Sequence, residues 1–338
     1  MKQLGIALLG MGRIGRLHGE NLAFNVPQAR LVIAADAFLN DAMKEWADSV
    51  GVDCTNDVMA AINHPEVDAV FICTSTAAHA ELIKAAAAAG KHIFCEKPIH
   101  TDLAQIREAI ADAETAGVKL QVGFVRRFDH NHKAVHDTVA SGVLGKPHVV
   151  KVCSRDPDHQ SMDYIKTSGG IFLDMTIHDF DMVRFLAGCD AEEIYVQSAV
   201  LVDPAIGEAG DVDTAVITLK MANGAIAVID NSRRAAYGYD QRAEVFGSKG
   251  MVATANDTLS TAVLSNADGV TGEKPLYFFL ERYMQSFATE VKGFIHAIEN
   301  DTDTLVGVED GLKPVLMGIA AKKSMEEHRP VKLSEIEY

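Results

Sequence analysis

Basic residues are scarce in this 338-residue chain, and long apolar runs are absent. Lys and Arg number 31 against 47 Asp and Glu, which gives a formal net charge of −16 at pH 7. Such an acidic chain is disfavoured as a partner of nucleic acid or of an anionic membrane surface, because both repel it. No run approaches the roughly 18 apolar residues that indicate a membrane-spanning helix. We therefore expect neither nucleic acid nor a membrane as a partner.

Cysteine is also sparse. The five cysteines, Cys54, Cys73, Cys95, Cys153 and Cys189, form no C-x-x-C pair. An odd, scattered set indicates reduced thiols in a reducing compartment and argues against a disulfide framework. The apolar stretch at the start is short and lacks a small-residue cleavage site, so it predicts a strand and not a signal peptide. Together these features predict a cytoplasmic protein.

The chain is too long for one typical domain and fits two. Hydrophobic residues make up 48% and charged residues 23%, which are ordinary globular values, so the core needs no disulfide or metal for stability. We see no internal repeat and no low-complexity segment. The change in pattern described below places the domain boundary between residues 124 and 125.

The first glycine-rich segment follows a short apolar run and reads Gly10-x-Gly12-x-x-Gly15. In a turn from a strand into a helix, Gly10 allows the tight turn and Gly12 leaves room for a pyrophosphate, while Gly15 lets the helix pack closely on the strand. The N–H groups at the start of that helix form an anion site. The spacing predicts a dinucleotide site that includes Arg13 and Ile14. The alternative is an ordinary strand–helix turn.

An acidic residue supports the first interpretation. The next apolar run, 29–35, ends in Asp36, which lies 21 residues after Gly15. A carboxylate there would accept hydrogen bonds from the ribose hydroxyls of the adenosine half. No Lys or Arg follows at 37–39 to favour a 2′-phosphate, so the pattern predicts NAD and not NADP. The alternative is a solvated strand end.

Strand and helix patterns alternate over about the first 120 residues, which predicts a doubly wound parallel sheet with ligands at the carboxyl ends of its strands. The expected strands after the first are Leu31–Ala35, Ala69–Thr74, His92–Cys95 and Leu120–Phe124, and the expected helices include Asp41–Val50, Ala80–Ala89 and Thr101–Ala116, the last capped by Thr101.

The rest of the chain is rich in strand patterns with few helices between them, which predicts an α+β domain with a large, mostly antiparallel open sheet. The expected strands are His148–Ser154, Glu193–Val202, Ala215–Met221, Ala225–Asn231 and Arg242–Phe246, with Val252–Ala255 and Thr261–Leu264 as possible edges. Asn223-Gly224 is a hairpin signal. Helical spacing from Tyr283 to Ile298 predicts a long amphipathic helix, and the final helix over Val306–Glu327 could return to the first domain.

Three segments could carry chemistry. In Glu96-Lys97-Pro98, at the end of a predicted strand, Lys97 would stabilise a developing alkoxide. Pro98 could follow a cis peptide bond. The alternative is a surface lysine paired with Glu96.

The second segment holds Asp174 and His178. If the chain is helical from Leu173 onward, the two side chains share one face, and a histidine of near-neutral pKa suits proton abstraction from an alcohol. No third ligand stands at metal-motif spacing, so we expect no metal. The alternative is a core histidine with a structural hydrogen bond.

The third group of candidates follows predicted strands and comprises Arg127, Asp156 and Tyr239. Arg and Tyr there could line a polar pocket with donors that recognise hydroxyl groups. The alternative for each is solvation at a strand end.

Taken together, these motifs resemble the glucose–fructose oxidoreductase / inositol dehydrogenase / rhizopine-catabolism family. The segments that begin at Gly123, Asp174 and Ser232 are similar to those of inositol 2-dehydrogenases within it. The resemblance implies a Rossmann domain over 1–124 and a substrate-binding and oligomerisation domain over 125–338.

The resemblance also implies a reaction and its residues. A cyclic polyol, best matched by myo-inositol, would lose a proton to His178 while hydride passes to NAD. Lys97 would bond the reacting oxygen, and Asp174 would hold a neighbouring hydroxyl and tune Lys97. Arg127, Asp156 and Tyr239 would line the pocket. In the family these groups meet between two domains, and the second sheet often builds a homotetramer.

Further cofactor contacts are implied for Thr74, Ser75, His79 and Glu96. Many relatives carry Pro or Asn in the loop at 73–79, and this chain does not. Two other functions stay open: a dehydrogenase for another inositol isomer or a pyranose sugar, and a dinucleotide-binding regulator without turnover.

Overall fold

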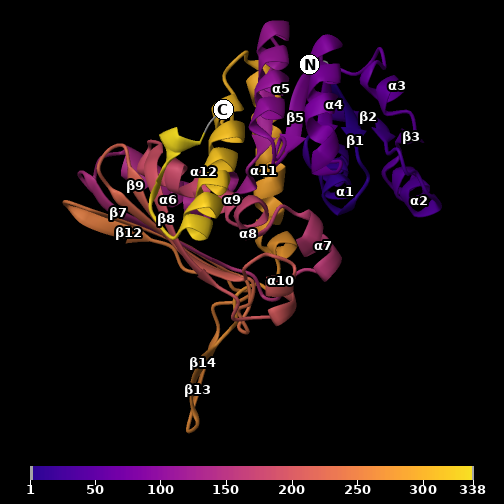
Figure 1. Cartoon of the computed structure of the whole chain (residues 1–338). Helices are drawn as coiled ribbons and strands as arrows, with labels where there is room; N and C mark the ends of the chain where they lie inside the picture. The colour runs from indigo at the N-terminus through magenta and orange to yellow at the C-terminus, as the bar shows by residue number, and fades with distance from the viewer. Residues whose placement is uncertain (1–2, 337–338) are drawn as a thin grey trace. The chain divides into compact units, whose positions relative to one another are not determined.

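The computed structural model describes residues 3–336, and Figure 1 traces them from indigo to yellow. The chain divides into two compact units. The first consists of residues 3–128 and 285–313, and the second of 129–284 and 314–336. Two long helices contribute residues to both units. The helix α11 (Phe279–Glu299) belongs to the second unit up to residue 284 and to the first unit from residue 285. The helix α12 (Val308–Glu327) belongs to the first unit up to residue 313 and to the second unit from residue 314. The expected boundary at residue 124 stays a prediction.

The first unit contains a six-stranded sheet in the order β3-β2-β1-β4-β5-β6. Every neighbouring pair is parallel, which confirms the predicted doubly wound sheet. The strands are β1 (Leu4–Leu9), β2 (Ala29–Ala35), β3 (Asp53–Thr55), β4 (Ala69–Ile72), β5 (His92–Glu96) and β6 (Leu120–Gly123).

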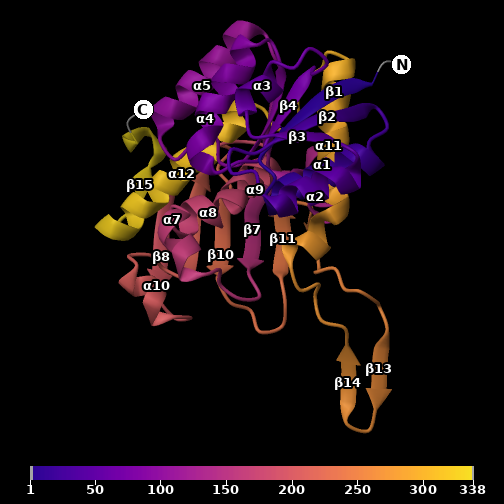
Figure 2. The ribbon, with the colours of Figure 1, turned by 90° about the vertical axis from the view of Figure 1, so that its right-hand side faces the viewer.

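Helices cover both faces of this sheet. Figure 2 shows α1, α2 and α11 on one side of it and α3, α4 and α5 on the other. Their bounds are α1 (Arg13–Glu20), α2 (Asp41–Val50), α3 (Val58–Ile62), α4 (Thr76–Ala88) and α5 (Leu103–Ala116), with a π-helical turn at Asn21–Asn25. The cap of α5 is Asp102 and not Thr101, since the Asp102 side chain accepts hydrogen bonds from Ala104 N and Gln105 N.

Aromatic rings form the centre of the core on the α11 side of the sheet. Phe71 of β4 and Phe94 of β5 stack with their centroids 4.6 Å apart, and Phe294 of α11 meets both rings edge-on. This packing fixes the strands whose carboxyl ends carry the candidate residues.

The second unit contains a seven-stranded sheet in the order β12-β11-β7-β10-β9-β8-β15. Its pairs are antiparallel except β7 and β10, so the predicted mostly antiparallel sheet is confirmed. The strands are β7 (Pro147–Arg155), β8 (Ala191–Ala199), β9 (Thr214–Met221), β10 (Ile226–Ser232), β11 (Asp240–Gly247), β12 (Gly250–Ala253) and β15 (Val331–Lys332).

Helices and short helical turns complete the two units. The second unit has α6 (His130–Ala140), α7 (Met162–Thr167), α8 (Ile171–Asp174), α9 (Ile177–Ala187), α10 (Pro204–Glu208) and a 3-10 turn at Leu333–Glu335, and the first unit ends its opening segment on a 3-10 turn at Val125–Phe128. No helix within residues 3–336 is long and apolar enough to cross a membrane.

The predicted edge at Thr261–Leu264 does not join the large sheet. Instead β13 (Val263–Asn266) pairs with β14 (Gly269–Gly272) as a separate hairpin. All eight strand residues are exposed, and Figure 2 shows the hairpin extending away from the sheet of its unit.

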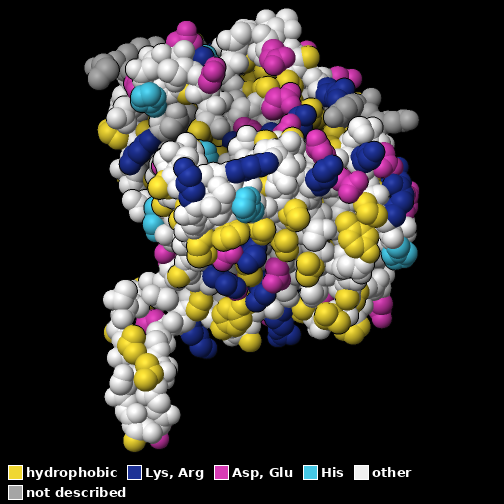
Figure 3. Space-filling view, turned by 90° about the vertical axis from the view of Figure 1, so that its left-hand side faces the viewer, with side chains coloured by type: hydrophobic (Ala, Val, Ile, Leu, Met, Phe, Trp, Pro, Cys, Tyr) yellow, Lys and Arg dark blue, Asp and Glu magenta, His cyan; other side chains and the backbone are white. Residues whose placement is uncertain are grey.

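One face of the large sheet is partly apolar. Val216, Ile226 and Phe246 alternate with buried neighbours along their strands and are 47%, 54% and 47% exposed. Figure 3 views this side, where hydrophobic side chains lie among Lys and Arg.

Candidate active site

The glycine turn lies between β1 and α1 in the first unit. Gly10 has φ +95°, and a Cβ there would lie 2.6 Å from the carbonyl oxygen of Cys73. A Cβ on Gly15 would lie 1.9 Å from the carbonyl oxygen of Gly10. Around Gly12, by contrast, no described atom lies within 4 Å of a Cβ position. The first and third glycines are therefore needed for packing, and the second leaves open space.

This turn fits the pyrophosphate and ribose of a dinucleotide. Gly12 is the N-cap of α1 and, having no side chain, provides no cap, so the first N–H groups of the helix stay available to an anion. Arg13 and Ile14 begin the helix. Asp36 lies just beyond β2, where its carboxylate accepts hydrogen bonds from Met11 N (2.8 Å) and Phe38 N (2.9 Å). The carboxylate is thus held beside the turn.

The loop after β4 carries the next candidates. Ser75 is the N-cap of α4 without a side-chain hydrogen bond to the helix. His79 is 1% exposed and contacts two carbonyl oxygens, Nδ1 to Pro98 O (2.8 Å) and Nε2 to Thr74 O (3.0 Å). Burial lowers the pKa of His79. Its ring therefore joins this loop to the segment that follows β5.

That segment begins with Glu96 at the end of β5. Oε1 of Glu96 lies 2.8 Å from Nε2 of His18, whose side chain is fully buried. Lys97 comes next, and its peptide bond to Pro98 is cis. Lys97 therefore stands at the carboxyl end of the parallel sheet, the edge where such sheets bind ligands.

Arg127 lies in the same unit, where its guanidinium forms a bidentate pair with Asp310. Nη2 lies 2.7 Å from Oδ1 and Nη1 lies 3.1 Å from Oδ2. A second bond from Nη1 reaches Leu305 O at 3.3 Å. These contacts anchor the expected pocket residue to the protein itself.

In the second unit, Asp174 and His178 lie on different helices, whereas a shared helix was expected. The helix α8 ends at Asp174, and α9 begins at Ile177. Thr176 between them is fully buried, and its hydroxyl donates to Asn231 Oδ1 of β10 at 2.7 Å. This tertiary bond fixes the break, and the two candidates come from different helices.

The environments of the second-unit candidates differ. Asp174 accepts a hydrogen bond from the Tyr164 hydroxyl (2.8 Å) and pairs with Arg233 (3.3 Å). His178 is half-buried, with its Nδ1 atom inside the protein. Asp156 is joined through its main chain to Ser232 and Ala235, and Tyr239 is buried at 7% exposure.

Sequence patterns missed several neighbours of these candidates. Tyr164 lies on the six-residue helix α7, and Asp211 lies in the loop before β9. Neither position stands out by spacing, because both meet Asp174 or Arg233 only through the fold. His18 was equally hidden, since it lies on α1 among residues predicted only to follow the glycine turn.

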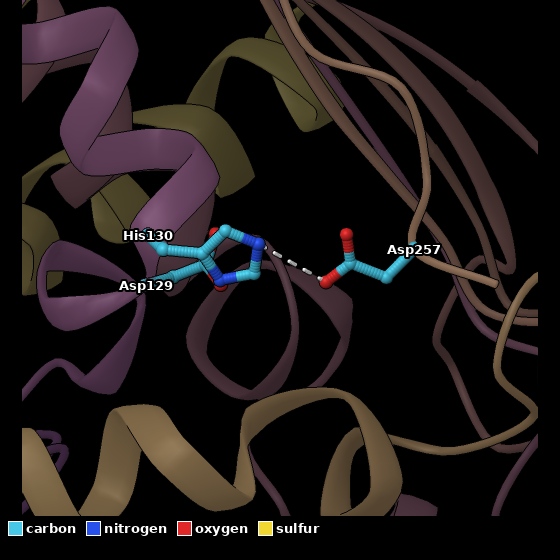
Figure 4. A group of neighbouring side chains, drawn as sticks. All are labelled: Asp129, His130 and Asp257. Carbon is cyan, nitrogen blue, oxygen red and sulfur yellow. Dashed lines mark ion pairs between the residues drawn. The ribbon is translucent and has the colours of Figure 1, made fainter. Parts of the chain in front are cut away.

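One cluster has the composition of a cation site. Asp129, His130 and Asp257 bring their ligand atoms within 4.8 Å of one another (Figure 4). Arg282 already supplies positive charge there, with Nη1 2.9 Å from Asp257 and Nη2 3.0 Å from Asp129. A guanidinium between the carboxylates makes this a network of ion pairs.

Comparison with known proteins assigns the chain to a family. The family model for an oxidoreductase family with an NAD-binding Rossmann fold matches residues 4–124, and the model for a GFO/IDH/MocA C-terminal domain matches 132–253. The protein is thus an NAD-dependent oxidoreductase of the class that acts on a CH–OH group. It belongs to the GFO/IDH/MocA family, as the predicted resemblance indicated.

Curated relatives match nearly the whole chain. A myo-inositol 2-dehydrogenase from Thermotoga maritima is 49% identical over 98% of this chain and 99% of its own length. An inositol 2-dehydrogenase from Rhizobium meliloti is 45% identical over 97% and 98%. A scyllo-inositol 2-dehydrogenase (NAD(+)) from Bacillus subtilis is 33% identical over 98% and 96%.

Solved structures of dehydrogenases share the fold of this chain. A probable dehydrogenase from Thermotoga maritima superposes with a TM-score of 0.97 at 49% identity, covering 99% of this chain and 100% of that one. A scyllo-inositol dehydrogenase from Lactobacillus casei, with bound NAD(H) and scyllo-inositol, gives 0.91 at 30% identity, covering 98% and 100%.

Proposed function

We propose that this enzyme oxidises myo-inositol to 2-keto-myo-inositol with NAD as the hydride acceptor. The observation that carries the proposal is the near-full-length match, at 49% identity, to an enzyme named myo-inositol 2-dehydrogenase. The fit of the glycine turn and Asp36 to a dinucleotide supports the cofactor.

In the proposed reaction, His178 takes the proton of the reacting hydroxyl while the carbon–hydrogen electron pair leaves as hydride and the carbon–oxygen bond becomes double. We assign proton uptake to Nε2, because Nδ1 of His178 is buried. Lys97 donates a hydrogen bond to the same oxygen and stabilises its negative charge as the proton leaves. Asp174 accepts a hydrogen bond from a neighbouring hydroxyl and orients the ring. NAD, when bound, supplies the hydride acceptor.

The other assignments are part of the same proposal. Cofactor contacts come from the turn, the acidic strand end and the segments after β4 and β5: Gly10, Gly12, Arg13, Ile14, Gly15, Asp36, Thr74, Ser75, His79, Glu96 and Lys97. Arg127, Asp156 and Tyr239 line the substrate pocket. Residues 1–124 form the dinucleotide domain and 125–338 the substrate domain.

We also propose a cytoplasmic homotetramer. Five free cysteines support a reducing compartment. The exposed Val216, Ile226 and Phe246 on one face of the large sheet support an interface between copies of the chain.

A second substrate is carried by a separate observation. The relative named scyllo-inositol 2-dehydrogenase is 33% identical over 98% of this chain. Scyllo-inositol differs from myo-inositol in the orientation of one hydroxyl, so only contacts in the pocket distinguish the two polyols. The test therefore includes a panel of inositol isomers.

The test is a turnover screen of the purified protein with inositol isomers and aldoses, each with NAD and NADP. We expect NADH formation with myo-inositol and much weaker activity with NADP. Lys97→Met and His178→Asn should each lower kcat by roughly 100- to 10,000-fold with the fold intact. Tight NAD binding without turnover of any polyol would contradict the proposal and favour a regulator.

A further inference from the structure

The carboxylate of Asp174 lies in a network of side chains that the proposed reaction does not use. We define the Asp174 clamp as Tyr164, Arg233 and Asp211. Tyr164 comes from α7, Arg233 follows β10, and Asp211 lies in the loop before β9. Three separate segments of the second unit thus converge on the end of α8.

Each oxygen of Asp174 has its own donor. The Tyr164 hydroxyl donates to Oδ1 at 2.8 Å, and Nη1 of Arg233 donates to Oδ2 at 3.3 Å. The two donors approach from different segments, so rotation of the carboxylate would break at least one bond. This arrangement fixes the plane of the carboxylate as well as its position.

Arg233 is itself anchored. It is 1% exposed, and its Nη2 donates to Asp211 Oδ2 at 3.3 Å. The other oxygen of Asp211 accepts from Ile171 N at 3.0 Å. Asp211 therefore binds the first residue of α8 through its main chain, while Arg233 binds the last residue, Asp174, through its side chain.

The clamp compensates for the shortness of α8. A helix of four residues makes too few internal hydrogen bonds to be stable alone. The Arg233–Asp211 bridge spans it from end to end and holds Asp174 where the chain breaks before α9. A guanidinium suits this role because its two Nη groups lie in one rigid plane and fix the geometry of both bonds, whereas an ammonium group is a point charge on a flexible stem.

Tyr164 supplies the other contact to Asp174. The residue is 46% exposed, so removal of its hydroxyl should change stability little. Burial and the charge of Asp174 raise the pKa of Tyr164, so the phenol keeps its proton and remains a donor.

We propose that Tyr164 and Arg233 are positioning residues that hold the Asp174 carboxylate in one orientation toward a polyol hydroxyl. The inference rests on the proposed function and deepens it. Loss of either donor lets the carboxylate rotate, so the substrate binds less often in the reactive orientation. The defect should therefore appear in the polyol step and leave NAD binding unchanged.

The test compares Tyr164→Phe with Tyr277→Phe in the full-length protein. Tyr277 is a 61% exposed tyrosine outside the proposed site and the exposed sheet face, so it is the matched control. We expect Y164F to lower kcat/KM for the polyol about 10-fold, the factor for loss of a charge-assisted hydrogen bond. The Kd for NAD and the melting temperature should stay as in the wild type, and Y277F should match the wild type throughout.

Arg233→Lys provides the second arm. We expect kcat/KM to fall roughly 100-fold, because the ammonium group lacks the rigid planar geometry that orients the Asp174 carboxylate. Again the Kd for NAD should not change, whereas a merely structural defect would lower the melting temperature and the fraction of active protein without altering KM.

The outcomes separate the two proposals. Suppose that the wild type is active. Unaltered kinetics in Y164F, or an R233K variant in which only the melting temperature changes, would then overturn the positioning role and leave the proposed function intact. A wild type that turns over no polyol would contradict the proposed function, and this inference with it.

Discussion

Gly12 and Gly15 lie three residues apart, but a methyl group would have opposite effects at the two positions. A Cβ on Gly15 would lie 1.9 Å from a backbone oxygen, whereas one on Gly12 would meet no described atom within 4 Å. The Gly12→Ala variant should therefore fold normally. Its Kd for NAD should rise about 100-fold, since the methyl group takes the space of the pyrophosphate. Gly15→Ala should destabilise the protein by roughly 1–3 kcal/mol or more.

Thermal melting and NAD titration of both variants check this contrast. Gly272→Ala, whose Cβ would also lie in open space on the exposed hairpin, is the control and should change neither quantity. Normal NAD affinity in G12A would show that the dinucleotide does not approach this turn.

Glu290 is an ionisable group in the core of the first unit. It is fully buried on α11, and within residues 3–336 neither of its carboxyl oxygens has a hydrogen-bond partner. Burial and then the charge of Glu96 raise the pKa of Glu290 well above its usual 4.5. The folded protein therefore holds this proton to a higher pH than the unfolded chain does.

This difference makes stability depend on pH in a predictable direction. Because the folded pKa is raised, wild-type stability falls relative to Glu290→Gln as pH rises above about 4.5, by up to about 1.4 kcal/mol per pH unit. Near pH 4 the difference between the two proteins should be smallest. Urea unfolding of both across this range measures it, and parallel curves for the two proteins would contradict a buried neutral acid.

At the scale of elements, the pair between Asp129 and Arg282 joins the start of α6 to α11. Asp129 is fully buried and caps α6 through His132 N, and Arg282 is 6% exposed. Arg282→Met should lower the free energy of unfolding by about 3–5 kcal/mol, because it removes the guanidinium that pairs with a buried carboxylate.

Adding Asp129→Asn to that variant should recover part of the loss, since the charge that needed compensation is gone. Denaturant unfolding of the two single variants and the double variant checks this. Strictly additive losses would show that the two side chains do not interact.

Helices and strands were predicted correctly where the local sequence pattern determines them. The prediction failed where a tertiary hydrogen bond determines the end of a helix. The apolar runs that end near Ile72 and Glu96 became parallel strands, because both faces of that sheet are covered. The helix expected through Asp174 and His178 breaks, because buried Thr176 bonds to Asn231 on a strand more than fifty residues later. Spacing alone contains no information about such a partner.

At the scale of the whole molecule, the cofactor half was more predictable than the substrate half. Gly10, Gly12, Gly15 and Asp36 lie within one strand–helix–strand segment, so their spacing carries the geometry. The Asp174 clamp is assembled from three distant segments, and its members are ordinary Tyr, Arg and Asp residues in sequence. Lys97, Asp174 and His178 were predicted from resemblance to a family, while the contacts that hold Asp174 required the fold.

The proposed reaction transfers a hydride from a polyol carbon to NAD. Turnover of myo-inositol carrying deuterium on carbon 2, followed by mass spectrometry of the reduced cofactor, tests this transfer directly. We expect NADH that carries the deuterium and a ketone at the labelled carbon. Unlabelled NADH, or no NADH at all, would contradict it.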